Sequence, residues 1–196
     1  MSSTTLTQQH AQNSEKTLFG FWVYIMTDCI LFASLFVTYI VLAGNTMGGP
    51  TAGELFSLPF VLTETMLLLT SSFTAGLAVL AAKLGHPQRV VMWLSATFVL
   101  GATFLGMELY EFAHLVREGH SWQENGFLSG FFALVGTHGI HITAGLIWIL
   151  VLVRHIAKKG ITAVTGQRLL MWGLFWHFLD IVWIFIFTFV YLMGAA

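Results

Sequence analysis

The chain has 196 residues, of which 57% are hydrophobic and 9% charged, and its formal net charge is −1. Soluble domains carry about 25% charged residues, so this composition excludes a water-soluble globule and predicts a membrane protein. A net charge this close to zero gives no indication of a nucleic-acid partner or of a basic membrane-surface patch.

Five apolar stretches are each long enough to cross a bilayer as a helix, which takes roughly 20 apolar residues. Runs of this length do not fit the ten-residue alternating strands of a membrane β-barrel. The predicted fold class is therefore an all-α membrane protein with five transmembrane helices in residues 18–196, after a polar cytoplasmic tail in residues 1–17. The spans in chain order are Phe19–Ala43, Leu58–Ala82, Val90–Phe112, Phe127–Val153 and Leu169–Met193.

Basic residues at the ends of the spans predict the orientation of the chain. Of the eight Lys and Arg residues, Arg117 alone falls on one side of the predicted membrane, and the other seven fall on the opposite side. By the positive-inside rule the N-terminus is cytoplasmic and the C-terminus periplasmic. Aromatic residues near the span ends are expected to form interfacial belts. They are Trp22, Trp93, Trp148 and Trp172 at the inner ends and Tyr39, Tyr110 and Tyr191 at the outer ends.

Eight ionisable side chains lie inside the spans, where charge is costly and marks a function or an internal partner. Six of them form pairs spaced i, i+3, and each pair is expected to share one helix face. At about 1.5 Å of rise per residue, the eight positions predict two polar layers. The candidate residues are Asp28, His141, His177 and Asp180 near mid-membrane, Glu64, Glu108 and Glu111 in the outer half, and His138, the helical partner of His141.

Residue type and spacing leave three interpretations of these side chains open. A metal site is one, because His and carboxylate pairs occur in di-iron bundles and in haem ligation, although the Glu-x-x-His pairs of di-iron bundles are absent. A proton or substrate pathway is the second. The third, favoured by residue type alone, is a set of interhelical hydrogen bonds that fix the packing. A ridge in span four supports it, formed by Ser129, Ala133, Thr137, His141 and Gly145.

Four sequence segments resemble motifs of one family, subunit III of the haem–copper terminal oxidases. The strongest is Gly136-Thr137-His138-Gly139-Ile140-His141 in span four, preceded by Ser129-Gly130-Phe131-Phe132. The others are Phe21 to Cys29 in span one, Glu108-Leu109-Tyr110-Glu111 in span three, and Phe175 to Trp183 in span five. Together the motifs cover nearly the whole chain from Leu18 onward.

The number of spans narrows the resemblance within the family. Five helices with this first span are most similar to the ubiquinol-oxidising bacterial branch, while five-helix subunits of cytochrome c oxidases are the alternative. One position departs from the family pattern. Some members carry a glutamate where this chain has Ser57, before Leu58-Pro59. The role of that glutamate would be absent here, or taken over in part by Glu64.

The resemblance implies a non-catalytic subunit of a complex that oxidises ubiquinol, reduces oxygen to water and pumps protons across the bacterial inner membrane. It implies no catalytic residue, metal or cofactor in this chain, with haem and copper held by subunit I. Subunit I would be the main contact, subunits II and IV further partners, and phospholipid would lie between the helices. The eight buried residues would be structural, lipid-contacting or proton-related. A self-contained di-iron membrane oxidase and a small proton-coupled transporter are the alternatives from other classes.

Overall fold

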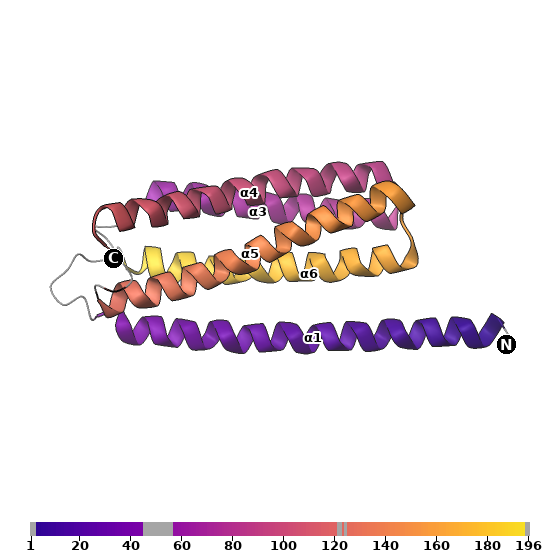
Figure 1. Cartoon of the computed structure of the whole chain (residues 1–196), viewed down its shortest axis with the longest axis horizontal. Helices are drawn as coiled ribbons and strands as arrows, with labels where there is room; N and C mark the ends of the chain where they lie inside the picture. Colours follow the sequence, from indigo (N-terminus) through magenta and orange to yellow (C-terminus); the bar gives the residue numbers. More distant parts are fainter. Residues whose placement is uncertain (1–2, 45–56, 121–122, 124, 195–196) are drawn as a thin grey trace.

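The computed structural model describes residues 3–44, 57–120, 123 and 125–194, with side chains described from residue 15 onward. The described chain is helical throughout and contains no strand (Figure 1). Its elements are α1 (Ser3–Leu42), α3 (Leu58–Lys83), α4 (Pro87–Arg117), α5 (Gly126–Lys159), α6 (Ala163–Ile186) and a π-helical turn, η1 (Phe187–Leu192), which continues α6.

The five predicted spans are confirmed, since the described residues contain five helices long and apolar enough to cross a membrane. Most helices run past the predicted spans. α5 reaches Lys159 rather than Val153, and α1 begins at Ser3, within the predicted polar tail. A helix satisfies its own backbone hydrogen bonds, so it need not end where the hydrocarbon ends. The breaker segment at residues 45–56 lies outside the described residues.

The predicted basic side of the membrane corresponds to one end of the bundle. Figure 1 places the start of α1, the α3–α4 turn and the α5–α6 turn at that end, and the C-terminus at the other. The orientation of these ends relative to the cytoplasm stays a prediction from the positive-inside rule.

Helix ends follow local sequence signals. Prolines occupy the first turns of α3 and α4, where the missing N–H costs nothing. Gly85 and Gly160 end α3 and α5 with φ of 73° and 68°, a conformation that side chains with a Cβ disfavour. Thr162 and Thr165 form a reciprocal capping box at the start of α6. The short turn between α5 and α6 is thereby fixed at both ends.

The helices form a bundle in which α6 is central and α1 peripheral. α6 packs against α3 and α5, and α3 packs along α4, while α1 lies mainly along α5 with fewer contacts to α6. Figure 1 shows α1 on one side of the bundle and the α3–α4 pair on the other. Any polar site between α1 and α4 must therefore pass through α5 or α6.

Three tryptophans of α6 fasten that helix to its neighbours. The indole N–H of Trp172 donates to the Gly145 carbonyl at 3.2 Å. Trp176 and Trp183 donate to the hydroxyls of Ser71 and Thr65 in α3, both at 3.1 Å. A buried indole needs an acceptor, and each of these bonds also fixes the rotation of α6 about its own axis.

The Trp176 ring lies between two glycines on different helices. A Cβ added at Gly101 of α4 or at Gly145 of α5 would come within 2.8 Å of the ring. Only a residue without a Cβ admits the ring at both positions, so these glycines set the spacing of α4, α5 and α6.

The predicted aromatic belts are only partly present. Tyr110 and Trp22 are exposed, as residues at a membrane interface would be. Trp172, Tyr39 and Tyr191 are instead buried in the bundle, each at most 3% exposed. Depth alone predicted a belt at these positions, but their helix faces turn them inward, where packing and hydrogen bonds hold them.

Candidate functional site

The half of the bundle that is predicted to be the outer one contains a cluster of three buried carboxyl groups, which we call the outer acid cluster. It comprises Glu64 of α3 and Glu108 and Glu111 of α4, which are 0%, 2% and 8% exposed. The three interact electrostatically, and none forms an ion pair within the described part of the chain. The predicted outer layer therefore comes together in space.

Hydrogen bonding within the outer acid cluster is unequal. Glu111 accepts a bond of 2.9 Å from the hydroxyl of Tyr191, which η1 carries. Both oxygens of Glu64 and of Glu108 lack a partner within the described chain. The Glu108 carboxyl lies against Gly139 of α5, where an added Cβ would come within 3.3 Å of it. Buried carboxyls are normally paired, so Glu64 and Glu108 depart from the usual pattern.

A cavity between the start of α3 and the end of α4 borders one member of the outer acid cluster. Its volume is about 230 Å³, and Glu111 forms part of its wall beside Ser57 and His114. Ser57, the position that departs from the family pattern, thus lies at the same cavity as Glu111. Of the three carboxyls, Glu111 is the one that borders this cavity.

Asp28 and His141 form the second polar contact and join α1 to α5. The Nε2 atom of His141 lies 3.7 Å from Oδ2 of Asp28. The Nδ1 atom bonds to the Thr137 carbonyl at 2.8 Å, so Nδ1 carries a proton. Nε2 is then the ring nitrogen that faces the carboxyl of Asp28.

His138 is fully buried one helical turn before His141. Neither ring nitrogen has a hydrogen-bond partner in the described chain. Its ring is stacked 5.3 Å from that of Trp183 and lies 6.1 and 6.4 Å from those of Phe104 and Phe32. Aromatic rings from α1, α4 and α6 thus surround an imidazole from α5.

The predicted mid-membrane group of four residues does not form. His177 is exposed on α6, whereas Asp180 is buried and lies beside Ser72 of α3. His177 and Asp180 still interact electrostatically, as their i, i+3 spacing predicts, but one is exposed and the other buried. Three residues turn a helix by about 300°, which leaves side chains about 60° apart, enough to separate an outward position from an inward one.

The described His and carboxylate side chains are spread over separate contacts rather than gathered into one donor set. No group of three or more His, Cys, Asp or Glu residues in this part of the chain is arranged to hold a metal ion. His138, the most buried histidine, is enclosed by aromatic rings rather than by other donors. The geometry therefore gives the metal interpretation no support.

Sequence reasoning missed the hydroxyl and indole groups that hold the bundle. Besides the three Trp bonds, Thr74 of α3 and Thr97 of α4 are joined at 2.8 Å. A signal was present, because a tryptophan in the middle of an apolar span requires an acceptor on another helix. The sequence offered no indication of which helix would supply it.

Known proteins match nearly the full length of this chain. The model of a family described as cytochrome c oxidase subunit III matches residues 1–195. A Pseudomonas aeruginosa protein named cytochrome bo(3) ubiquinol oxidase subunit 3 is 55% identical, over 95% of this chain and 90% of its own length. A Bacillus sp. PS3 protein named cytochrome c oxidase subunit 3 is 48% identical, over 90% and 86%. A Bacillus subtilis quinol oxidase subunit 3 is 43% identical, over 96% and 93%.

Proposed function

The chain belongs to the cytochrome c oxidase subunit III family, and from that premise we propose that it is a structural subunit of a bacterial ubiquinol oxidase. Membership makes it a multi-pass membrane subunit of a terminal oxidase complex that includes a catalytic subunit I. The single observation that carries the assignment is the family match over residues 1–195, with the Gly136 to His141 motif inside it.

In this proposal, subunit I carries out the redox chemistry of the complex. The haem and copper of that subunit reduce oxygen, and this chain contributes no redox centre. The aromatic enclosure of His138 and the lack of a clustered donor set among the described residues support this.

The proposed electron donor is ubiquinol, in the bacterial inner membrane. Support comes from the names of relatives at 55% and 47% identity, from Pseudomonas aeruginosa and Buchnera aphidicola, which both specify a ubiquinol oxidase. Cytochrome c is the second candidate, because the Bacillus sp. PS3 relative at 48% identity is named for that donor.

The buried polar groups divide between two proposed roles. The Asp28–His141 contact and the Trp bonds of α6 hold the helices, and with them the surface that meets subunit I. We assign the outer acid cluster a role in supporting proton uptake by the complex. Two of its carboxyls lack partners in the described chain, and a cavity lies beside Glu111. Subunits II and IV and phospholipid complete the proposed assembly.

Purification of the native complex tests these proposals. We expect subunits I, II and IV with this chain, oxygen uptake driven by ubiquinol rather than by cytochrome c, and haem and copper in subunit I. Metal analysis of this chain after separation is the critical measurement. Stoichiometric iron, copper or haem on the isolated chain would overturn the structural role.

A further inference from the structure

Four titratable side chains follow one side of α4 toward the end that is predicted to be outer. They are Glu108, Glu111, His114 and the C-cap residue Glu118, at spacings of three, three and four residues. Successive members rise by about 4.5–6 Å along the helix, and their directions fall within about 120° of one another. Glu108 and Glu111 are buried, whereas the side chains of His114 and Glu118 are 57% and 50% exposed. The series therefore runs from the interior of the bundle to its surface.

The cavity of about 230 Å³ at this end borders both a buried and an exposed member of the series. Glu111 and His114 line it, and Ser57 and Tyr110 add two hydroxyl groups to its wall. A water molecule occupies about 30 Å³ in the liquid and needs two to four polar partners when it is enclosed. The volume and the lining therefore suit several water molecules, which would connect the His114 ring with the Glu111 carboxyl.

Existing contacts leave one atom of each of these two residues for that water. Nε2 of His114 lies 3.3 Å from Oε1 of Glu118, and the His114 ring is stacked on that of Tyr110 at 6.2 Å. Nδ1 of His114 makes no hydrogen bond with the described residues. Oε2 of Glu111 accepts the Tyr191 hydroxyl at 2.9 Å, which leaves Oε1. Nδ1 of His114 and Oε1 of Glu111 are thus the remaining polar atoms of the two residues.

A third carboxyl, on another helix, faces the interior end of the series. Glu64 of α3 is fully buried, and neither of its oxygens has a partner in the described chain. It interacts electrostatically with Glu108 and Glu111, and the ion pairs within the described chain include none of the three. Buried carboxylates this close repel one another, so a bound proton relieves the repulsion. Any such proton comes from water, and Glu111 is the member that borders a water-sized space.

We propose that α4 carries a proton-exchange route between the outer acid cluster and water at the predicted outer face, with His114 as the surface proton carrier. In the inward direction, Nδ1 of protonated His114 gives a proton to cavity water, and that water gives one to Oε1 of Glu111. Neutral His114 regains a proton from bulk water, and Glu111 passes its own to Glu108 or Glu64. The outward direction is the reverse, and no other bond forms or breaks. The inference rests on the proposed proton role of the outer acid cluster and adds a route and a membrane face.

Hydrogen–deuterium exchange of the buried carboxyls in the intact oxidase complex tests this route. Protonated carboxyls give C=O stretching bands in the infrared, and these bands shift when deuterium replaces the proton. Bands lost in Glu64→Gln and Glu108→Gln identify the cluster, and their rate of shift after transfer to D₂O is measured. In H114A we expect this rate to fall about tenfold, less than the hundredfold or more that a positioned proton carrier contributes, because cavity water remains.

Chemical rescue distinguishes a proton carrier from a side chain that only supports the structure. Because the His114 side chain is 57% exposed, H114A should assemble normally and keep the thermal midpoint of the complex. Millimolar imidazole should restore most of the exchange rate in H114A. E111Q keeps an oxygen for the Tyr191 hydroxyl but cannot relay a proton, so its exchange should be slow with or without imidazole. Failure of imidazole to accelerate exchange in H114A would overturn His114 as the carrier.

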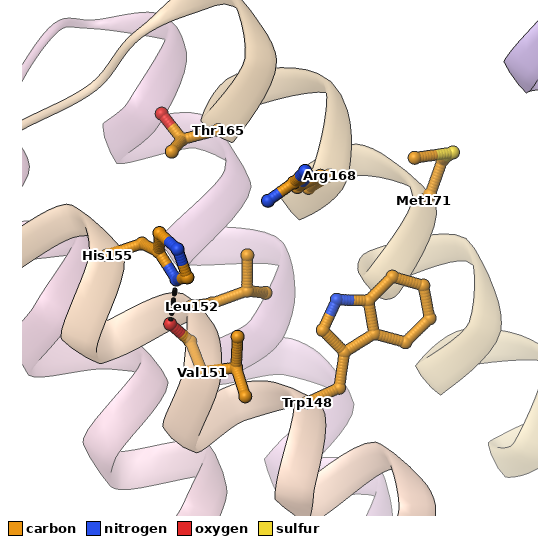
Figure 2. Close-up of a pocket in the computed structure, with 7 residues that line it drawn as sticks. All are labelled: Trp148, Val151, Leu152, His155, Thr165, Arg168 and Met171. Carbon is orange, nitrogen blue, oxygen red and sulfur yellow. Dashed lines mark hydrogen bonds between the residues drawn. The ribbon is translucent and has the colours of Figure 1, made fainter.

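His155→Ala is the matched control at the opposite end of the bundle. His155 is a partly exposed histidine of α5 whose Nδ1 bonds to the Val151 carbonyl at 2.8 Å, the dashed line in Figure 2. It lines a cavity of about 270 Å³ whose described wall, which includes Arg168, contains no Asp or Glu. Its replacement should leave carboxyl exchange at the wild-type rate. Equal slowing in H155A and H114A would overturn the assignment of the route to α4.

The outcomes separate this route from the proposed role of the cluster. Wild-type exchange rates in H114A and E111Q would overturn the route but leave the cluster as a proton-binding group that is served from elsewhere. If E111Q does not assemble, H114A and its rescue by imidazole decide the same question. Absence of any carboxyl band that Glu64→Gln or Glu108→Gln removes would overturn both the route and the proton role, because the carboxyls would then be permanently ionised.

Discussion

α1 and α6 are similar in apolar character but differ in what surrounds them. In the most apolar stretch of α1, 22% of the residues are buried, whereas 50% are buried in the corresponding stretch of α6 and η1. α6 carries three indole bonds to neighbouring helices, whereas the polar contact of α1 is Asp28 with His141. Hydropathy therefore identifies a span, but packing and hydrogen bonds decide whether that span is central or peripheral.

The largest effect that would sharpen this comparison is expected from Trp176→Ala. The change removes the bond to Ser71 and leaves a space between Gly101 and Gly145, so it should cost about 3–5 kcal/mol. The thermal midpoint of the detergent-solubilised complex reports the loss. Trp22→Ala in α1, where the side chain is 50% exposed, should cost less than about 0.5 kcal/mol. Equal losses in the two variants would remove the distinction between the helices.

Gly145→Ala should destabilise by about 1–3 kcal/mol, because the new Cβ would lie 2.8 Å from the Trp176 ring. Gly20→Ala in α1 is the matched control, since a Cβ there has nothing within 4 Å. Alanine favours a helix over glycine by up to about 1 kcal/mol, so the control should be neutral or stabilising. The same measurement of the thermal midpoint should show shifts of opposite sign, and two downward shifts of similar size would contradict the predicted role of the glycines.

The Asp28–His141 contact is expected to couple α1 to α5 by about 1 kcal/mol. A double-mutant cycle with Asp28→Ala and His141→Ala measures this coupling, read as the stability of the complex in detergent. A coupling near zero would leave α1 held by apolar contacts alone. The comparison cycle combines Asp28→Ala with Ser72→Ala. Its coupling energy should be close to zero, because Asp28 and Ser72 lie on different sides of α6.

The smallest effect is expected at Thr74→Val, at about 0.6 kcal/mol. This change removes the 2.8 Å bond to Thr97 between α3 and α4 while keeping the shape of the side chain. Thr38→Val in α1 is its counterpart, because the Thr38 hydroxyl bonds to the Ser34 carbonyl of its own helix. Only the Thr74 change should lower the melting temperature measurably, and a larger loss at Thr38 would reverse the proposed ranking of the two helices.

The sequence predicted the spans well because helix length and apolar content are properties of single segments. The closeness of Glu108 and Glu111 follows from their spacing on one helix. The partner of Asp28 and the outward position of His177 could not be predicted, because they depend on how α1 and α6 are rotated against their neighbours. Trp172 shows the same difficulty. Its depth in the span indicated an interface, but its direction is set by the Gly145 carbonyl on another helix.

The position of the Trp176 ring between Gly101 and Gly145 also bears on the order in which the helices of the bundle come together. α6 follows α3, α4 and α5 along the chain, so it is the last of the four to be synthesised. Until α6 enters the membrane, the hydroxyls of Ser71 and Thr65 have no indole N–H from which to accept a hydrogen bond. The space between Gly101 and Gly145 likewise has no Trp176 ring to fill it. The earlier helices can associate, but their final spacing awaits α6, so the insertion of that helix completes the packing of these four helices.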